Sequence, residues 1–75
     1  MRRRTDMAAI PIVVNGAARD VPAGMTVPEL LTELGLGVGW VVVEHNGTAL
    51  LRKEVEATVL AAGDVLELVR AVAGG

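Results

Sequence analysis

The 75-residue sequence has no cysteine, phenylalanine or tyrosine, and Trp40 is its only aromatic residue. The absence of cysteine excludes disulfides, thiolate metal sites, a catalytic thiol and a persulfide carried on a side chain. The core must therefore be built from aliphatic residues and methionine. A domain this short has little room for the pocket of roughly 300 Å³ or more that binds a small molecule. The composition favours a binding or carrier protein over a self-sufficient catalyst.

Charge and hydropathy argue against two further kinds of partner. The formal net charge is −2, so the chain lacks the basic footprint of a nucleic-acid-binding protein. Its one basic cluster, Arg2-Arg3-Arg4, lies in a polar stretch without the apolar segment of a signal peptide. No run approaches the ~20 apolar residues of a membrane span. We expect a cytoplasmic protein that binds neither nucleic acid nor membrane, with a flexible N-terminal extension (residues 1–9) and translation from Met1 or Met7.

Two Asn-Gly dipeptides, Asn15-Gly16 and Asn46-Gly47, predict type I′ hairpin turns, because both central positions of that turn need a positive φ. Apolar and β-branched residues flank each dipeptide. Another alternating apolar run follows the turn at 62–64 near the C-terminus. The expected strands cover residues 10–14, 17–21, 40–44, 48–51 and 65–72.

A single helix is expected between the hairpins. Thr26 and Glu29 have the spacing of a capping box, apolar residues recur with helical spacing up to Leu34, and Gly35 suits the position that ends a helix. The charged segment 52–58 is expected to be irregular or one helical turn.

Pairing the last strand with the first would remove two apolar edges. These elements predict an α+β domain over residues 10–72 with the β-grasp (ubiquitin-like) fold, a four- to five-stranded mixed sheet packed on one helix. Residues 73–75 would then form a flexible tail.

No group of side chains suggests catalysis or metal binding. His45 has no evident acidic or serine partner and adjoins a hairpin turn, so we expect an exposed residue. The glycines of segment 35–39 follow a helix and precede a strand, whereas a phosphate-binding loop lies between a strand and the helix after it.

The C-terminus, Ala73-Gly74-Gly75, is the remaining candidate. Glycine has no Cβ, so the tail suits a narrow channel in another protein. The carboxylate of Gly75 is a poor acyl donor and needs activation, for which an acyl-adenylate made with ATP by a second enzyme is the economical route. Attack by a sulfur nucleophile would leave a thiocarboxylate, the only place where this cysteine-free chain could hold transferable sulfur.

A docking patch for a partner protein is expected on the last strand. The hydrophobic fraction of 52% exceeds what one helix-covered face needs, which favours an apolar patch on the opposite sheet face. Side chains along a strand alternate between faces, so one of two sets must point outward. The predicted patch is Leu66, Leu68 and Arg70.

Four segments and the terminal Gly-Gly resemble the thiamine-biosynthesis sulfur carrier (ThiS) family. The segments are residues 13–16, 24–31, 41–47 and 63–75. The resemblance implies a carrier that is not itself an enzyme, whose C-terminal glycine is adenylated by an E1-like activating enzyme using ATP and is then thiocarboxylated. Gly75 would bear the acyl group and the sulfur, with Gly74 and Ala73 in the partner's channel. A cysteine persulfide on another protein would supply the sulfur, and a thiazole synthase would receive it; the carrier itself binds no cofactor.

Other interpretations stay open at this point. The small subunit of molybdopterin synthase has the same fold and ending, although the short hairpin at Asn15-Gly16 favours the thiamine carrier. A cysteine-biosynthesis carrier, a ubiquitin-like protein tag and a β-grasp interaction module that makes no use of Gly75 are further alternatives. The sequence also leaves the sulfur donor and the oligomeric state open.

Overall fold

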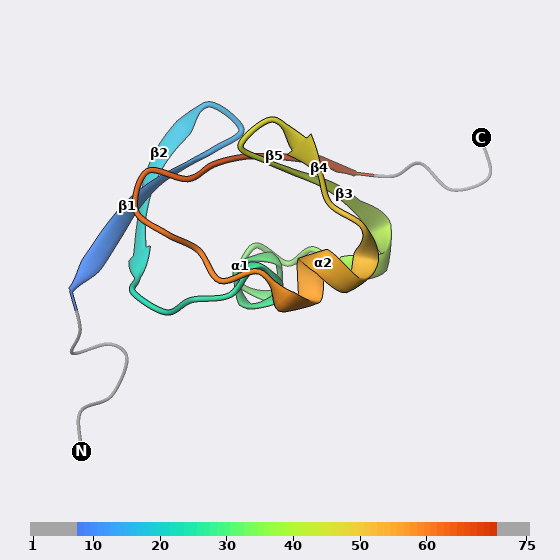
Figure 1. Cartoon of the computed structure of the whole chain (residues 1–75), viewed down its shortest axis with the longest axis horizontal. Helices are drawn as coiled ribbons and strands as arrows, with labels where there is room; N and C mark the ends of the chain where they lie inside the picture. Colours follow the sequence, from blue (N-terminus) through green and yellow to red (C-terminus); the bar gives the residue numbers. More distant parts are fainter. Residues whose placement is uncertain (1–7, 71–75) are drawn as a thin grey trace, which may run out of the picture.

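The computed structural model describes residues 8–70, which form one five-stranded sheet and the helices that cover it (Figure 1). The elements are β1 (Ala9–Val14), β2 (Ala17–Pro22), α1 (Val27–Glu33), the 3₁₀ helix η2 (Val38–Trp40), β3 (Val41–His45), β4 (Thr48–Ala49), α2 (Arg52–Ala57) and β5 (Val65–Arg70). The strand order is β2-β1-β5-β3-β4. β5 runs parallel to β1 and antiparallel to β3, so the predicted pairing of the first and last strands and the β-grasp fold are confirmed.

Both predicted hairpin turns form. Asn15 and Asn46 have φ of 51° and 52°, and the glycines that follow them have φ of 80° and 86°. These positive values are those that a type I′ turn needs at both central positions. The turns set the register of β1 with β2 and of β3 with β4.

The predicted capping box begins α1. The Thr26 side-chain oxygen accepts from the Glu29 amide at 3.3 Å, and the Thr26 amide donates to the Glu29 carboxylate at 2.9 Å. Gly35 follows the helix with a φ of 76°, a left-handed conformation that glycine adopts without strain. Local chemistry therefore fixes both ends of this helix.

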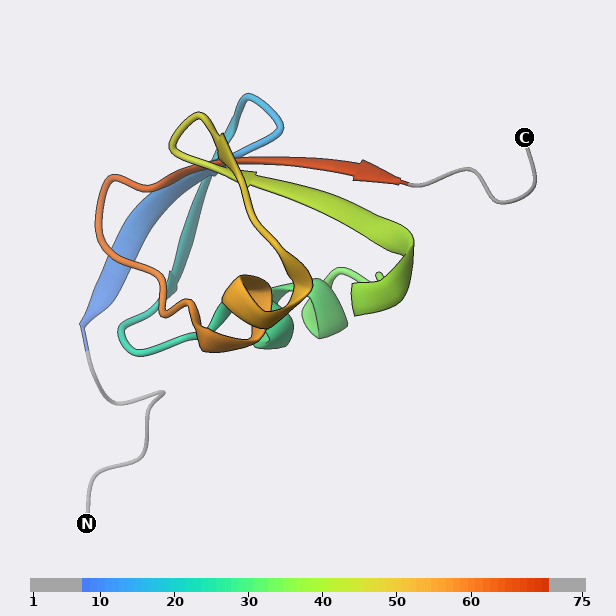
Figure 2. The ribbon, with the colours of Figure 1, turned by 45° about the vertical axis from the view of Figure 1, so that its right-hand side comes forward.

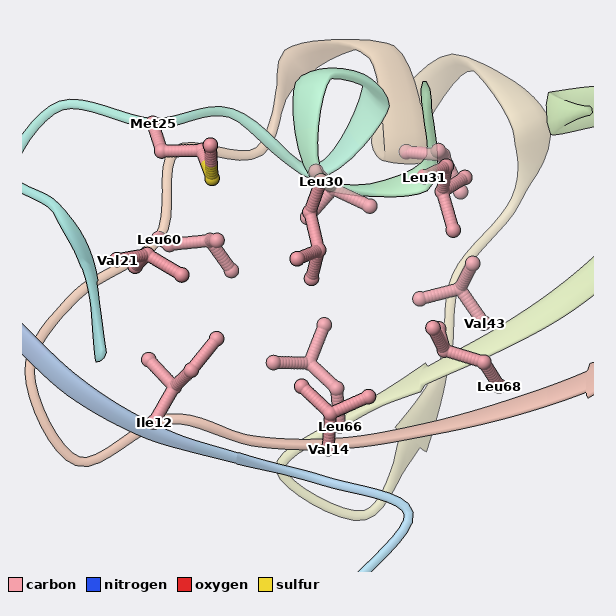
Figure 3. Packing of buried hydrophobic residues seen from close by; sticks show 12 residues of the cluster. Ile12, Val14, Val21, Met25, Leu30, Leu31, Val43, Leu60, Leu66 and Leu68 are labelled. Atoms are coloured by element: carbon pink, nitrogen blue, oxygen red, sulfur yellow. The ribbon is translucent and has the colours of Figure 1, made fainter. Parts of the chain in front are cut away.

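The core lies between the sheet and the helices, which cover the same face of the sheet (Figure 2). Leu30 and Leu31 of α1 are fully buried and lie opposite Ile12, Val43 and Leu66 of the sheet (Figure 3). The other core members are Val14, Val21, Met25, Val27, Val55, Leu60 and Leu68. Aliphatic residues and one methionine thus build the core, as expected for a chain without phenylalanine or tyrosine.

Several expected elements differ from the structure by one or more residues. Segment 52–58 contains a second helix, α2, in which only Val55 is buried. A charged helix with one buried side chain has no row of apolar residues at helical spacing, so the sequence pattern does not predict it. β4 is limited to Thr48–Ala49, shorter than expected. Trp40 belongs to η2 rather than to β3, and it is 60% exposed. The expected end of the last strand, residues 71–72, lies outside the described residues.

Candidate functional site

The candidate site is the C-terminus and the strand that leads to it. Ala73, Gly74 and Gly75 lie outside the described residues, so the structure shows only how the chain approaches them. β5 is the central strand, paired with β1 on one side and with β3 on the other. The residues before the tail therefore belong to a strand that is paired on both sides.

Asn15 joins the first hairpin turn to the middle of β5. Its amide donates to the carbonyl oxygen of Leu66 at 2.9 Å, and its side-chain oxygen accepts from the Leu68 amide at 2.7 Å. The pairing of β1 with β5 ends at Leu66, whereas the pairing with β3 continues to the Val41–Arg70 pair. Asn15 extends the support of β5 by one more hydrogen bond, and β3 sets the direction in which the chain leaves the sheet.

A cluster of polar side chains fixes the start of β5. Asp64 is buried, with only 7% of the residue exposed. Its carboxylate lies 2.9 Å from the Nε2 atom of His45. It also accepts hydrogen bonds from the Asn46 side-chain amide at 3.1 Å and from the Ala61 backbone amide at 2.9 Å. The Asn46 side-chain oxygen accepts from the Val65 amide at 2.8 Å. Because an ionised carboxylate can only accept, Nε2 of His45 carries the proton. The expectation that His45 is an exposed residue without an acidic partner is wrong.

The pKa of Asp64 lies below its ordinary value. Burial, the largest influence, raises this pKa, but the hydrogen bonds from His45, the Ala61 amide and Asn46 together outweigh it. A depressed carboxyl pKa stabilises the fold above the unfolded-state pKa of about 3.9. That stabilisation is lost as the pH falls through the lower pKa of the folded state.

Asp64→Asn is expected to lower the free energy of unfolding at pH 7 by about 1–3 kcal/mol, because it leaves buried donors without their acceptor. The difference between variant and wild type should begin to shrink below the unfolded-state pKa of about 3.9 and continue to shrink as the pH falls toward the lower pKa of the folded state. Urea unfolding at pH 7 and pH 3 measures both effects. Asp20→Asn is the matched control, since Asp20 is exposed on β2. A difference that is the same at both pH values would contradict this role of the carboxylate.

The predicted docking patch is misplaced in two of its three residues. Leu66 is fully buried and Leu68 is 9% exposed, because both point toward the helices; only Arg70 is exposed. Strand alternation alone does not say which set faces the core. Glu67, a charged residue in the other set, was the indication in the sequence that this set faces outward.

The sheet face turned away from the helices carries the other set. Val42, Val65 and Val69 are 48%, 45% and 57% exposed, and Glu44 and Glu67 are exposed beside them. We call these five residues the open face. An apolar surface on the sheet face opposite the helices, as the sequence predicts, is therefore present, with different residues from those expected.

A surface pocket of about 350 Å³ lies beside the end of β5, although little room for a pocket of this size was expected from the length of the chain. Trp40 and Arg70 line it together with Gly35, Leu36, Gly37 and Val41. A Cβ on Gly37 would come within 3.0 Å of the Trp40 ring, so glycine lets the indole lie against the backbone there. No sequence pattern indicates this pocket, because it depends on contacts between η2, β3 and β5.

Two kinds of feature are absent from residues 8–70. Within this range, no group of three or more histidine or acidic side chains is arranged to hold a metal ion. No helix in the same range is long and apolar enough to cross a membrane.

Sequence comparison decides the family. The sequence model of the ThiS family matches residues 12–75, most of the chain, including its terminal glycines. The chain belongs to the ThiS family. This membership assigns it to a family of small sulfur carriers connected with thiamine biosynthesis and confirms the resemblance.

Solved structures agree with this membership. The crystal structure of the thiamine biosynthesis protein ThiS from Geobacter metallireducens superimposes with a TM-score of 0.74 at 33% identity, covering 88% of this chain and 100% of that one. An NMR structure of a thiamine biosynthesis protein from the same organism gives a TM-score of 0.71 at 33% identity, covering 88% of both chains.

A curated relative is much longer. A thiazole synthase of Paramagnetospirillum magneticum is 38% identical over 64 residues. The match covers 85% of this ThiS-family chain but only 20% of the thiazole synthase. The chain therefore spans about a fifth of that relative.

Proposed function

We propose that this ThiS-family chain carries sulfur as a thiocarboxylate on Gly75 and delivers it for thiazole formation in thiamine biosynthesis. The observation that supports this most is the family match, which continues through the terminal Gly74-Gly75 of a chain without cysteine. The central position of β5 adds a physical reason. A strand paired on both sides that leads to a glycine tail suits a carrier whose folded domain stays outside the partner while its C-terminus enters the partner's active site.

Three successive reactions at the C-terminus of Gly75 account for the formation of the thiocarboxylate. A carboxylate oxygen attacks the α-phosphorus of ATP in an E1-like activating enzyme, which forms the acyl-adenylate and releases pyrophosphate. A persulfide sulfur of a donor protein then attacks the acyl carbon and expels AMP. A thiol must afterwards reduce the resulting acyl disulfide, which leaves the thiocarboxylate on the carrier and a disulfide on the donor side. The chain supplies only the acyl group, so it acts as a co-substrate rather than an enzyme.

A thiazole synthase is the proposed acceptor. A sequence similar to 85% of this chain forms part of a protein named thiazole synthase, and joining two activities in one polypeptide raises the effective concentration of one for the other. The presence of a similar sequence within a thiazole synthase favours a thiazole synthase, rather than a molybdopterin synthase, as the protein that receives the sulfur.

Intact-mass spectrometry after reconstitution tests the proposed chemistry. We expect the chain, incubated with ATP, the activating enzyme, a protein persulfide and a thiol, to gain the mass of one oxygen-to-sulfur exchange, located at Gly75 by fragmentation. Omitting ATP should prevent the gain. A chain that stays unmodified while the activating enzyme modifies a known carrier would contradict the proposal.

A further inference from the structure

Two acidic side chains face each other on the open face. Glu44 of β3 and Glu67 of β5 are directly opposite in the antiparallel register, and both are exposed. Among residues 8–70, neither carboxylate has an ion-pair partner; the ion pairs there are Arg19–Glu33 and His45–Asp64. Like charges in this position destabilise a sheet. Sheet stability therefore gives no reason for this pair.

Three valines flank the pair. The Val42–Val69 pair is the next pair of β3 and β5 on the same face of the sheet. Val65 is the next residue on that face in the other direction along β5. All three valines are between 45% and 57% exposed. The two carboxylates thus lie within an apolar surface.

The basic side chains of the described range lie elsewhere. Arg19 bonds to Glu33 of α1, Arg52 and Lys53 belong to α2, and Arg70 lines the pocket beside η2. The helices α1, α2 and η2 all lie on one side of the sheet, opposite the open face (Figure 2). The open face consequently has acidic and apolar chemistry without a neutralising cation from residues 8–70.

We propose that the open face docks the activating enzyme that receives the tail. An arginine or lysine of that enzyme lies between Glu44 and Glu67, and its apolar side chains contact the valines. A guanidinium suits this position, because it can donate to two carboxylates at once. Val65, Glu67 and Val69 belong to the strand that continues into the tail, so one partner can contact the face and receive Gly75. The inference rests on the proposed function, which supplies the activating enzyme as the partner to be tested.

Charge also argues against a second copy of this chain as the occupant. A symmetric dimer presents the same patch from both subunits. Two open faces in contact would bring four carboxylates together without a cation from either face. The proposed occupant is therefore a different, basic surface.

Neutralising the pair is expected to have opposite effects on stability and on docking. Glu44→Gln combined with Glu67→Gln should raise the melting temperature by roughly 1–6 °C, because it removes a cross-strand repulsion. The same variant should raise the KM for the carrier in ATP-dependent adenylation about tenfold with little change in kcat, and should weaken the dependence of KM on salt. The single variants should show smaller changes in the same directions. Glu56→Gln, which removes an exposed charge from α2, should leave KM unchanged.

Each other outcome overturns the inference. If the wild-type chain is adenylated and the double variant has the same KM and salt dependence, the docking inference fails while the proposed function stands. If the wild-type chain is not adenylated at all, the proposed function fails and the inference fails with it. The double variant could instead have a lower melting temperature than the wild type. If that decrease disappears when Arg2, Arg3 and Arg4 are replaced by serine, the two glutamates bind the basic segment of the same chain and not a partner. Self-association of the wild type that the double variant alters would assign the face to a second copy.

Discussion

A few residues added after Gly75 are expected to abolish ATP-dependent activation while leaving the folded domain unchanged. The extension converts the terminal carboxylate into an amide, which lacks the anionic oxygen that attacks ATP, and it moves the new carboxylate away from the nucleotide. The same residues added before Met1 provide the matched control, which should retain activity. ATP–pyrophosphate exchange with the activating enzyme, together with a melting curve, measures both properties. Full exchange activity in the C-terminally extended chain would leave a plain β-grasp interaction module as the better description.

Gly74→Val tests the width of the tail with its length preserved. Four extended residues, 72–75, span at most ~13–14 Å, so the carboxylate can enter a partner's nucleotide site only if the residues behind it also enter. A branched side chain at position 74 is expected to collide with a channel shaped for glycine and to block pyrophosphate exchange. Because position 74 lies beyond β5, the melting temperature should not change. Normal exchange by this variant would contradict a narrow channel.

Leu66→Ala is expected to have the largest effect on stability, a loss of about 2–5 kcal/mol. Leu66 is fully buried in the central strand, where truncation leaves a cavity between the sheet and α1. Such a loss is a large fraction of the stability of a small domain. Leu51→Ala is the matched control, since Leu51 is 62% exposed. Urea unfolding of both variants measures the difference.

The comparison also tests the corrected orientation of β5. Equal small losses for Leu66→Ala and Leu51→Ala would mean that Leu66 faces solvent, as the docking patch predicted from the sequence requires. A large loss for Leu66→Ala alone would confirm that the outward set is Val65, Glu67 and Val69.

Local patterns in the sequence sufficed for the elements that local chemistry determines. The Asn-Gly dipeptides and the Thr26–Glu29 capping box each form within a few residues, so their sequence patterns specify their geometry. The pairing of β1 with β5 connects distant segments, but it followed from the need to cover two apolar strand edges. The fold was therefore predictable.

Predictions from the sequence were wrong where the local structure depends on contacts between distant residues. His45 and Asp64 are 19 residues apart in the sequence. They meet because the turn between β3 and β4 lies beside the turn that precedes β5. The orientation of β5 required knowledge of which set of side chains meets α1. The role of the terminal glycines stays a prediction, which the sequence alone can make because the proposed chemistry uses the terminal carboxylate and needs no tertiary partner.

The most direct test of the central claim follows the sulfur atom itself. The chain is converted to its thiocarboxylate with isotopically heavy sulfur, purified, and incubated with a thiazole synthase and its other substrates; the thiazole product is then analysed by mass spectrometry. The proposed function predicts heavy sulfur in the thiazole and a chain returned to its carboxylate form. A thiazole without the heavy isotope, or a thiocarboxylate consumed only by molybdopterin synthase, would contradict it.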